Sequence, residues 1–217
     1  MKGFNITMRI LLTIVLFIAS VSALGLIIHD VFSDNLTVID TLVIEKVKKL
    51  HSPCMTTVMK FITFFGSSWF LVPAYCAIAL YYYFIKKNKK LVFDILAVYI
   101  TGRIVLLSAK YYFQRQRPED TLIGHLASFS FPSGHSFSAF TFFGLLIYVS
   151  SYYSLSFFQR LAVIFLSFTA ACLIAFSRVY LGVHFPSDVI AGFCLCIVWL
   201  IISFSVLNNI KLSDKDK

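Results

Sequence analysis

Side chains able to do chemistry gather in three short stretches, 110–118, 132–135 and 177–188, of a chain that is otherwise mostly apolar. Charged groups at the ends of hydrophobic runs are costly unless they pair or bind something. Fixed cations beside imidazoles are suited to binding a phosphate monoester, so the stretches predict a phosphate site. The residues concerned are Lys110, Arg117, His135, Arg178, His184 and Asp188.

The first stretch combines Lys110, at the end of an apolar run, with Arg117-Pro118 seven residues later. An ammonium supplies a compact charge, and a guanidinium can hold two phosphate oxygens at once. For either cation taken alone, a snorkelling residue at the headgroup level is the better explanation. Phosphate binding becomes the favoured interpretation only when the other two stretches are considered together with these cations.

The second stretch is Pro132-Ser133-Gly134-His135, which directly precedes an apolar, helix-like run. The first N–H groups of a helix lack partners within it, and its dipole adds positive potential, so this end can cradle a phosphate. Ser133 would add a hydroxyl donor, and His135 would stand beside the phosphoryl group. The alternative is a plain helix cap in which His135 is incidental.

The third stretch places His184 four residues before Asp188, with Ser177-Arg178 upstream. If a helix begins at Pro186, the Asp188 carboxylate can reach the His184 ring. A carboxylate on one ring nitrogen fixes the tautomer and leaves the other nitrogen free to attack phosphorus. The alternative role of Asp188 is to cap the helix.

Composition indicates a membrane protein, because 59% of the 217 residues are hydrophobic and only 13% are charged. A membrane-crossing helix needs about 20 mostly apolar residues. We therefore predict an all-α, polytopic membrane bundle of about six transmembrane helices in a single domain, 1–217. The predicted spans are 10–28, 61–85, 91–109, 136–151, 161–176 and 189–207.

Basic residues predict the orientation, since Lys and Arg are enriched in cytoplasmic loops. With six spans they all lie on one side of the membrane, which is then the cytoplasmic side. This orientation places the tail 211–217 in the cytoplasm and the three motifs at the non-cytoplasmic ends of the spans. The N-terminal run also resembles a cleavable signal peptide, although its length favours an uncleaved anchor. The basic residues are Lys2, Arg9, the lysines within 86–90, Arg160, Lys211, Lys215 and Lys217.

The external connection 29–56 contains a helical pattern, with Leu42, Val43 and Val47 on one side and charged residues on the other. An interfacial helix that helps lipid reach the site and a packed cap on the bundle are both compatible with it.

Two other classes are disfavoured. The net charge of +9 forms short clusters between apolar runs rather than a basic stripe, which argues against nucleic-acid binding. The number of cysteines, five, is odd, which argues against a disulfide framework. The pair Cys194-x-Cys196 has no second pair of ligands nearby, which argues against a zinc site.

Taken together, the patterns Lys-x6-Arg-Pro, Pro-Ser-Gly-His and Ser-Arg-x5-His-x3-Asp resemble the signature of the type-2 phosphatidate phosphatase superfamily. Every signature position is filled between 110 and 188. The six-span layout is similar to that of the bacterial membrane members, which implies a multi-pass bacterial plasma membrane protein whose site faces the periplasm or exterior.

The resemblance also implies roles. His184 would be the nucleophile that forms a phosphohistidine, Asp188 would orient it, and His135 would protonate the leaving oxygen. The phosphoryl oxygens would be held by Lys110, Arg117, Ser133, the Gly134 N–H and Arg178.

The implied activity is hydrolysis of a lipid-linked phosphate monoester or diphosphate, in the bilayer and without metal or cofactor. Undecaprenyl diphosphate, phosphatidylglycerophosphate, phosphatidate and a lipid A phosphate all share the group that these motifs recognise; the oligomeric state is open. A metal hydrolase using His135, His184 and Asp188 is the rival enzyme, but nearby cations already supply the charge of a metal.

The rival outside enzymes is a non-enzymatic transporter or channel with an anion-binding site, since Asp94 and Arg103 interrupt the third span. Arg103 lies seven residues before Lys110, so both face the same interior side of a helix. We expect Arg103 either to pair within the bundle or to contact the substrate headgroup.

Overall fold

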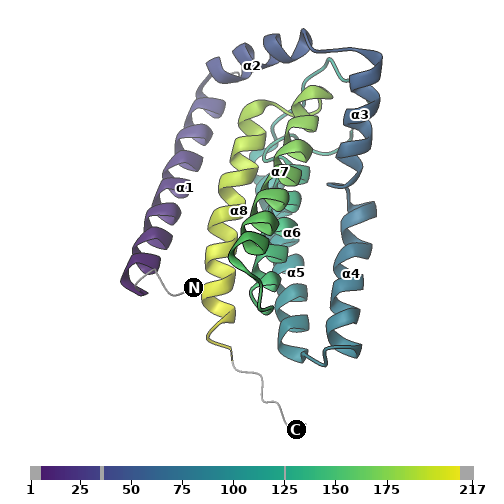
Figure 1. The fold of residues 1–217 in the computed structure, drawn as a ribbon. Coiled ribbons are helices and arrows are strands. Elements are labelled where there is room, and N and C mark those ends of the chain that lie inside the picture. Colours follow the sequence, from purple (N-terminus) through teal and green to yellow (C-terminus); the bar gives the residue numbers. More distant parts are fainter. Residues whose placement is uncertain (1–5, 35–36, 125, 211–217) are drawn as a thin grey trace.

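The computed structural model describes residues 6–34, 37–124 and 126–210, and within these ranges the chain forms helices and no strands. The axes of most helices are roughly aligned, and α2 lies across one end of the bundle (Figure 1). The predicted all-α membrane bundle is confirmed. The helices are α1 (Ile6–Asp34), α2 (Val38–Lys48), α3 (Pro53–Phe64), α4 (Ser68–Phe84), α5 (Lys89–Phe113), α6 (Gly134–Ser150), α7 (Phe157–Tyr180) and α8 (Pro186–Leu207).

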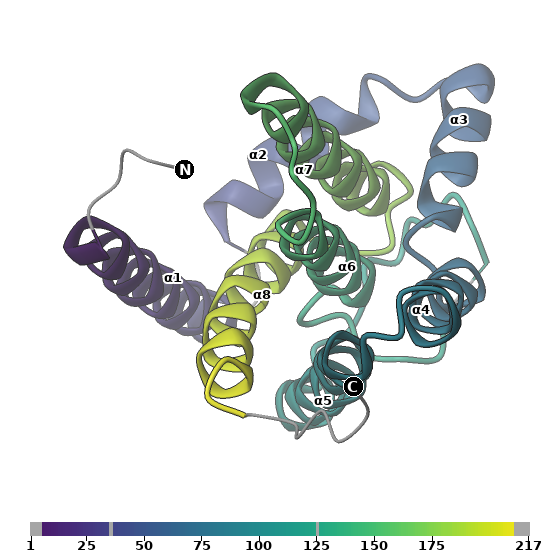
Figure 2. The ribbon, with the colours of Figure 1, turned by 60° about the horizontal axis from the view of Figure 1, so that its bottom comes forward.

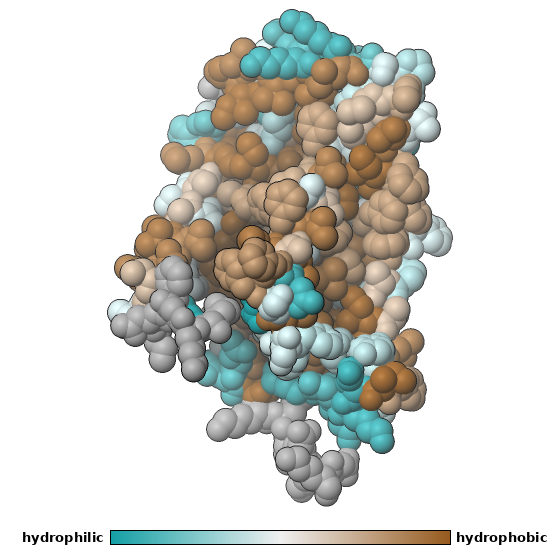
Figure 3. Space-filling model, viewed as in Figure 1, coloured by the Kyte–Doolittle hydropathy of each residue, from teal (hydrophilic) through white to brown (hydrophobic). Residues whose placement is uncertain are grey.

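Five helical segments of the described chain are long and apolar enough to cross a membrane, and α6 is a shorter apolar helix of 17 residues. Figure 2 shows α6 near the centre of the bundle and α1 at its edge beside α8. An apolar band separates hydrophilic ends on the face drawn in Figure 3. The five segments are Thr7–Ser33, Pro53–Phe84, Lys89–Phe113, Phe157–Tyr180 and Pro186–Leu207.

The predicted span 61–85 overlaps the candidate crossing segment Pro53–Phe84, but this segment is not one continuous helix. The α3 helix ends at Phe64 and α4 begins at Ser68, so the helical conformation is interrupted around Gly66. A Cβ atom at Gly66 would lie 2.4 Å from Ile174 Cγ2 and 3.1 Å from His135 Cδ2. The break thus brings backbone close to the second motif, where a larger residue would not fit.

The helices α5 and α7 extend past their predicted ends, to Phe113 and Tyr180. Lys110 and Arg178 therefore lie on the last turns of these helices, at the same end of the bundle. The α4–α5 and α6–α7 connections lie at the opposite end (Figure 1), which separates the described basic loops from the motifs. Lys2, Lys211, Lys215, Lys217 and the predicted tail 211–217 fall outside the described residues.

The α2 helix is a packed cap on the motif-bearing end. Val47 is buried in a cluster with Val179, Leu181 and Met59. The opposite side of α2 exposes Val38 and other apolar side chains, so a cap packed against the bundle also presents apolar surface outward.

The α6 and α8 helices approach closely where the second and third motifs meet. The Ser133 N–H donates to the Asp188 carbonyl oxygen at 3.0 Å. A Cβ atom at Gly192 would lie 2.9 Å from the Ser133 carbonyl oxygen, so only glycine permits this contact. The glycine therefore sets how near the α6 N-terminus stands to Asp188.

We expect Gly192→Ala to lower the free energy of unfolding by about 1–3 kcal/mol, as an overpacked contact does. Gly25→Ala is the matched control, because nothing lies within 4 Å of a Cβ atom there, and replacing a mid-helix glycine by alanine is neutral or stabilising by about 1 kcal/mol. Thermal unfolding in detergent measures both. Equal stability of the two variants would contradict the close-contact explanation.

Candidate active site

The three motifs converge on one cavity of about 270 Å³ at the α2 end of the bundle. Lys110 comes from α5, Arg117 from the loop after it, His135 from the start of α6, and Arg178 from the end of α7. His184 lies in the short connection before α8. The side chains that line the cavity include Lys110, Arg117, Gly134, His135, Arg178 and His184, together with Arg103.

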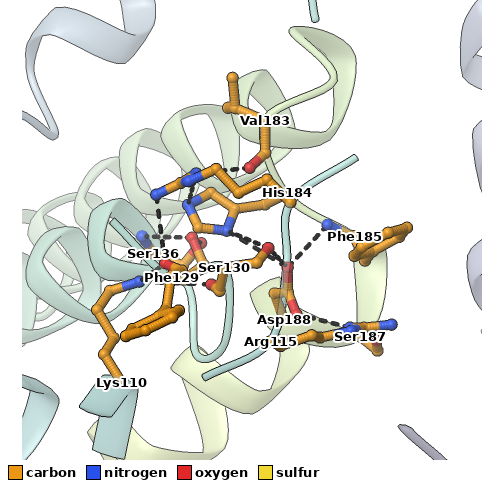
Figure 4. A network of polar contacts seen from close by, with 12 residues as sticks. Lys110, Arg115, Phe129, Ser130, Ser136, Val183, His184, Phe185, Ser187 and Asp188 are labelled. Atoms are coloured by element: carbon orange, nitrogen blue, oxygen red, sulfur yellow. Dashed lines mark hydrogen bonds and ion pairs between the residues drawn. The ribbon is translucent and has the colours of Figure 1, made fainter. Parts of the chain in front are cut away.

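His184 and Asp188 form a buried pair. His184 Nδ1 lies 3.4 Å from Asp188 Oδ2, and the carboxylate is 0% exposed. The same oxygen accepts hydrogen bonds from the Phe185 N–H at 2.9 Å and from the Ser130 hydroxyl. Figure 4 shows these groups directed at the carboxylate. Asp188 therefore contacts the imidazole and also caps the start of α8. The two predicted roles are compatible in this geometry, and the orienting role in catalysis stays a prediction.

The second nitrogen of His184 faces the cations. Nε2 lies 3.2 Å from Arg117 Nη1, and the Arg117 guanidinium also donates to the Val183 carbonyl oxygen at 2.6 Å and to the Ser128 carbonyl oxygen at 2.7 Å. Burial lowers the pKa of His184 to about 3, and the hydrogen bond with Asp188 opposes that shift only in part. The imidazole is therefore neutral near pH 7, with its proton on the Asp188 side and a lone pair on Nε2.

The cations around the cavity are not neutralised by the protein. Lys110 Nζ donates to the Phe129 carbonyl oxygen at 2.5 Å, and Arg178 Nη1 donates to Thr63 Oγ1 at 2.7 Å. The Arg178 Nε atom is buried without a hydrogen-bond partner. Within the described ranges, no carboxylate forms an ion pair with Lys110, Arg117 or Arg178. The charge of the cavity lining therefore favours an anion over a cation.

The start of α6 contributes backbone to this cavity. Ser133 is the N-cap of α6, and its hydroxyl oxygen accepts hydrogen bonds from the Ser136 N–H and the Ser136 hydroxyl. Ser133 is fully buried and is not among the residues that line the cavity. Gly134 and His135 do line it. A phosphate contact by the Ser133 hydroxyl stays a prediction.

Three residues of the network were missed by sequence reasoning. Arg115 donates to Asp188 Oδ1 at 2.6 Å and to Asp40 Oδ2 at 2.9 Å, and Ser130 bonds the other oxygen of Asp188. The position of Arg115, two residues before Arg117, was a signal in the sequence that could have identified it as part of the site. Asp40 lies more than seventy positions from its partners, so no local pattern could have found it.

Among the residues described, no group of three or more His, Cys, Asp or Glu side chains could hold a metal ion. The groups that could hold a substrate anion are therefore the cations and backbone N–H groups of the cavity.

Comparisons with known proteins agree with this geometry. Residues 90–211 match the model of the PAP2 superfamily. The chain is 36% identical over 148 residues to phosphatidylglycerophosphatase B of Bacillus subtilis, covering 67% of this chain and 72% of that protein.

Two crystal structures are similar. A transmembrane PAP2-type phosphatidylglycerolphosphate phosphatase from Bacillus subtilis has a TM-score of 0.81 and 28% identity, covering 90% of this chain and 97% of that one. LpxE of Aquifex aeolicus has a TM-score of 0.61 and 25% identity, covering 76% and 94%.

Fold, site and relatives define a multi-pass membrane phosphatase. Within that class, the chain belongs to the PAP2 superfamily, the type-2 phosphatidate phosphatase family that its three motifs resemble.

Proposed function

We propose that this protein removes the terminal phosphate of a membrane lipid by way of a phosphohistidine on His184. The observation that carries the proposal is the meeting of a neutral imidazole nitrogen with three unneutralised cations in one cavity. The names of the similar proteins from Bacillus subtilis point to phosphatidylglycerophosphate as one substrate, and undecaprenyl diphosphate, phosphatidate and a lipid A phosphate carry the same reacting group.

In the proposed reaction, His184 Nε2 attacks phosphorus and the bond from phosphorus to the lipid oxygen breaks. His135 gives a proton to that leaving oxygen. Lys110, Arg117 and Arg178, with the Gly134 N–H, hold the phosphoryl oxygens as charge builds in the transition state. Water then attacks the phosphohistidine and gives a proton back to His135, which releases inorganic phosphate and restores both histidines. Asp188 stabilises the charge that the imidazole gains.

We propose that the reaction needs no metal, because these cations already supply the positive charge that a divalent ion would bring. The transporter alternative is weaker. Asp94 is bonded to Lys90 and to the Tyr148 hydroxyl near the end of the bundle opposite the site, rather than lining a polar pathway with Arg103.

We expect His184→Ala to reduce phosphate release to background in excess EDTA, while Asp188→Asn lowers kcat by about 10²–10⁴-fold. Release of inorganic phosphate from a panel of lipid phosphates in detergent is the measurement. His29→Ala is the control, since His29 is an exposed histidine on α1. Turnover by a folded His184→Ala protein would rule out the nucleophile. Activity that EDTA abolishes and one divalent ion restores would rule out the metal-free reaction.

We further propose that Arg103 contacts the lipid headgroup. It lines the same cavity as Lys110 and lies about 10 Å deeper along α5 at 1.5 Å per residue. No hydrogen bond or ion pair to Arg103 is found within the described chain. A lipid whose tail extends into the bilayer would place a second phosphate, between tail and scissile phosphate, near this guanidinium.

Arg103→Gln is therefore expected to lower kcat/KM about 10–100-fold for undecaprenyl diphosphate and phosphatidylglycerophosphate, the loss of a charge-assisted bond to phosphate. For phosphatidate, which lacks a second phosphate, the change should stay within about threefold. Arg160→Gln, at the opposite end of the bundle, is the control. Equal losses on all three lipids would remove Arg103 from headgroup recognition.

We propose that the site faces away from the cytoplasm, because the lysine-rich α4–α5 loop and the α6–α7 connection before Arg160 lie at the opposite end of the bundle. Glu119→Cys and Lys86→Cys, each exposed and each made in a background without native cysteines, test this. An impermeant thiol reagent should label the position-119 thiol on intact cells or spheroplasts and the position-86 thiol only after permeabilisation. The reverse pattern would place the site in the cytoplasm.

A further inference from the structure

A buried carboxylate of α2, outside the segment that matches the family model, is connected to the His184–Asp188 pair through hydrogen bonds with Arg115 and Ser187. Asp40 is 0% exposed, although α2 lies on the outer end of the bundle. It accepts hydrogen bonds from the Ser187 N–H at 2.8 Å, from the Ser187 hydroxyl at 2.7 Å and from Arg115 Nη2 at 2.9 Å. The matched segment begins at residue 90, so the family match assigns Asp40 no role.

Arg115 joins this carboxylate to the active site. Its Nη1 atom donates to Asp188 Oδ1 at 2.6 Å and to the Ser187 hydroxyl at 2.8 Å. The guanidinium lies over the Phe185 ring, 4.1 Å from its centroid. One planar group therefore bonds α2, the start of α8 and the residue that orients His184, and Figure 4 shows Arg115 beside Asp188 and Ser187.

The placement of Arg115 argues against a direct role in phosphate binding. Arg115 is not among the residues that line the cavity containing His184, Lys110 and Arg178. It acts on the opposite side of Asp188, where it bonds the oxygen that His184 does not use. Its influence on the reaction must pass through the position and charge of Asp188.

Asp40 limits how strongly Arg115 neutralises Asp188. A guanidinium bonded to two carboxylates divides its charge between them, whereas bonded to Asp188 alone it would weaken the acceptor that the His184 ring needs. The Asp40 carboxylate also fixes the backbone of Ser187, the residue just before Asp188. The charge of Asp40 and its hydrogen bond to Ser187 thus both help to keep Asp188 in place as the acceptor for the His184 ring.

We propose that Asp40 is a positioning residue for the His184–Asp188 pair, acting through Arg115 and Ser187, so that docking of α2 completes the active site. This inference rests on the proposed phosphohistidine reaction.

We expect Asp40→Asn to lower kcat about 10–100-fold with KM changed less than about twofold, as loss of a supporting hydrogen-bond partner does. Two matched controls should stay near wild type. Glu45→Gln removes an exposed carboxylate of the same helix, and Asp120→Asn removes the exposed ion pair with Lys48 that ties α2 to the loop after α5. Thermal unfolding in detergent shows whether each protein is folded.

A double-substitution cycle separates positioning from plain structural support. Arg115→Gln removes the cation bonded by both buried carboxylates, so it should cost more activity than Asp40→Asn. Adding Asp40→Asn to Arg115→Gln removes one of the facing charges, so the double variant should be faster than Arg115→Gln alone. This comparison also gives the result if Asp40→Asn alone does not fold.

Wild-type kcat in a folded Asp40→Asn protein would overturn the inference, and so would additive losses in the double variant. Failure of the proposed function looks different, because His184→Ala would then retain turnover. An inactive His184→Ala protein together with a fully active Asp40→Asn protein would reject the role of Asp40 alone.

Discussion

The carboxylate of Asp188 is fully buried, and a buried charge is stable only where hydrogen-bond donors and cations replace the water it has lost. Those donors come from three segments of the chain. They are the Arg115 guanidinium, the Ser130 hydroxyl, and the His184 ring with the adjacent Phe185 N–H. Each segment must hold its register for the others to reach the same two oxygens. The position of the imidazole therefore follows from how one buried carboxylate is satisfied.

The same residue also places the N-terminal end of α6, which is the proposed phosphate-binding end. Its carbonyl oxygen accepts from the Ser133 N–H, directly before the residues whose backbone lines the cavity. Gly192 allows this contact by leaving room for the Ser133 carbonyl oxygen. The main-chain bond of Asp188 and its side-chain bonds thus fix the position of His184, the proposed nucleophile, relative to the N-terminus of α6.

The parts of this arrangement that depend on spacing along one element could be predicted from the sequence. Lys110, His135 and Arg178 follow from charges at the ends of apolar runs, and His184 with Asp188 follows from a four-residue spacing across a helix start. The break at Gly66 was not predicted, although Gly66-Ser67-Ser68 is a turn-type sequence. The runs on both sides of it are apolar on all helix faces, so their hydropathy pattern does not mark where one helix ends and the next begins. Asp40 and Ser130 escaped because their partners are brought to them only by tertiary packing.

Arg115 has a further consequence for the charges around the imidazole. A lone buried carboxylate near Lys110 and Arg117 would attract them and reduce the positive potential available to a substrate anion. Arg115, itself bonded to Asp40, occupies the Asp188 oxygen that faces away from His184, and no ion pair joins Asp188 to the cavity cations in the described chain. The His184 ring then stands between two regions, with Nδ1 toward the carboxylates and Nε2 toward the cations. Because these regions stay separate, the imidazole can be held neutral and oriented on one side while an anion is attracted to the other.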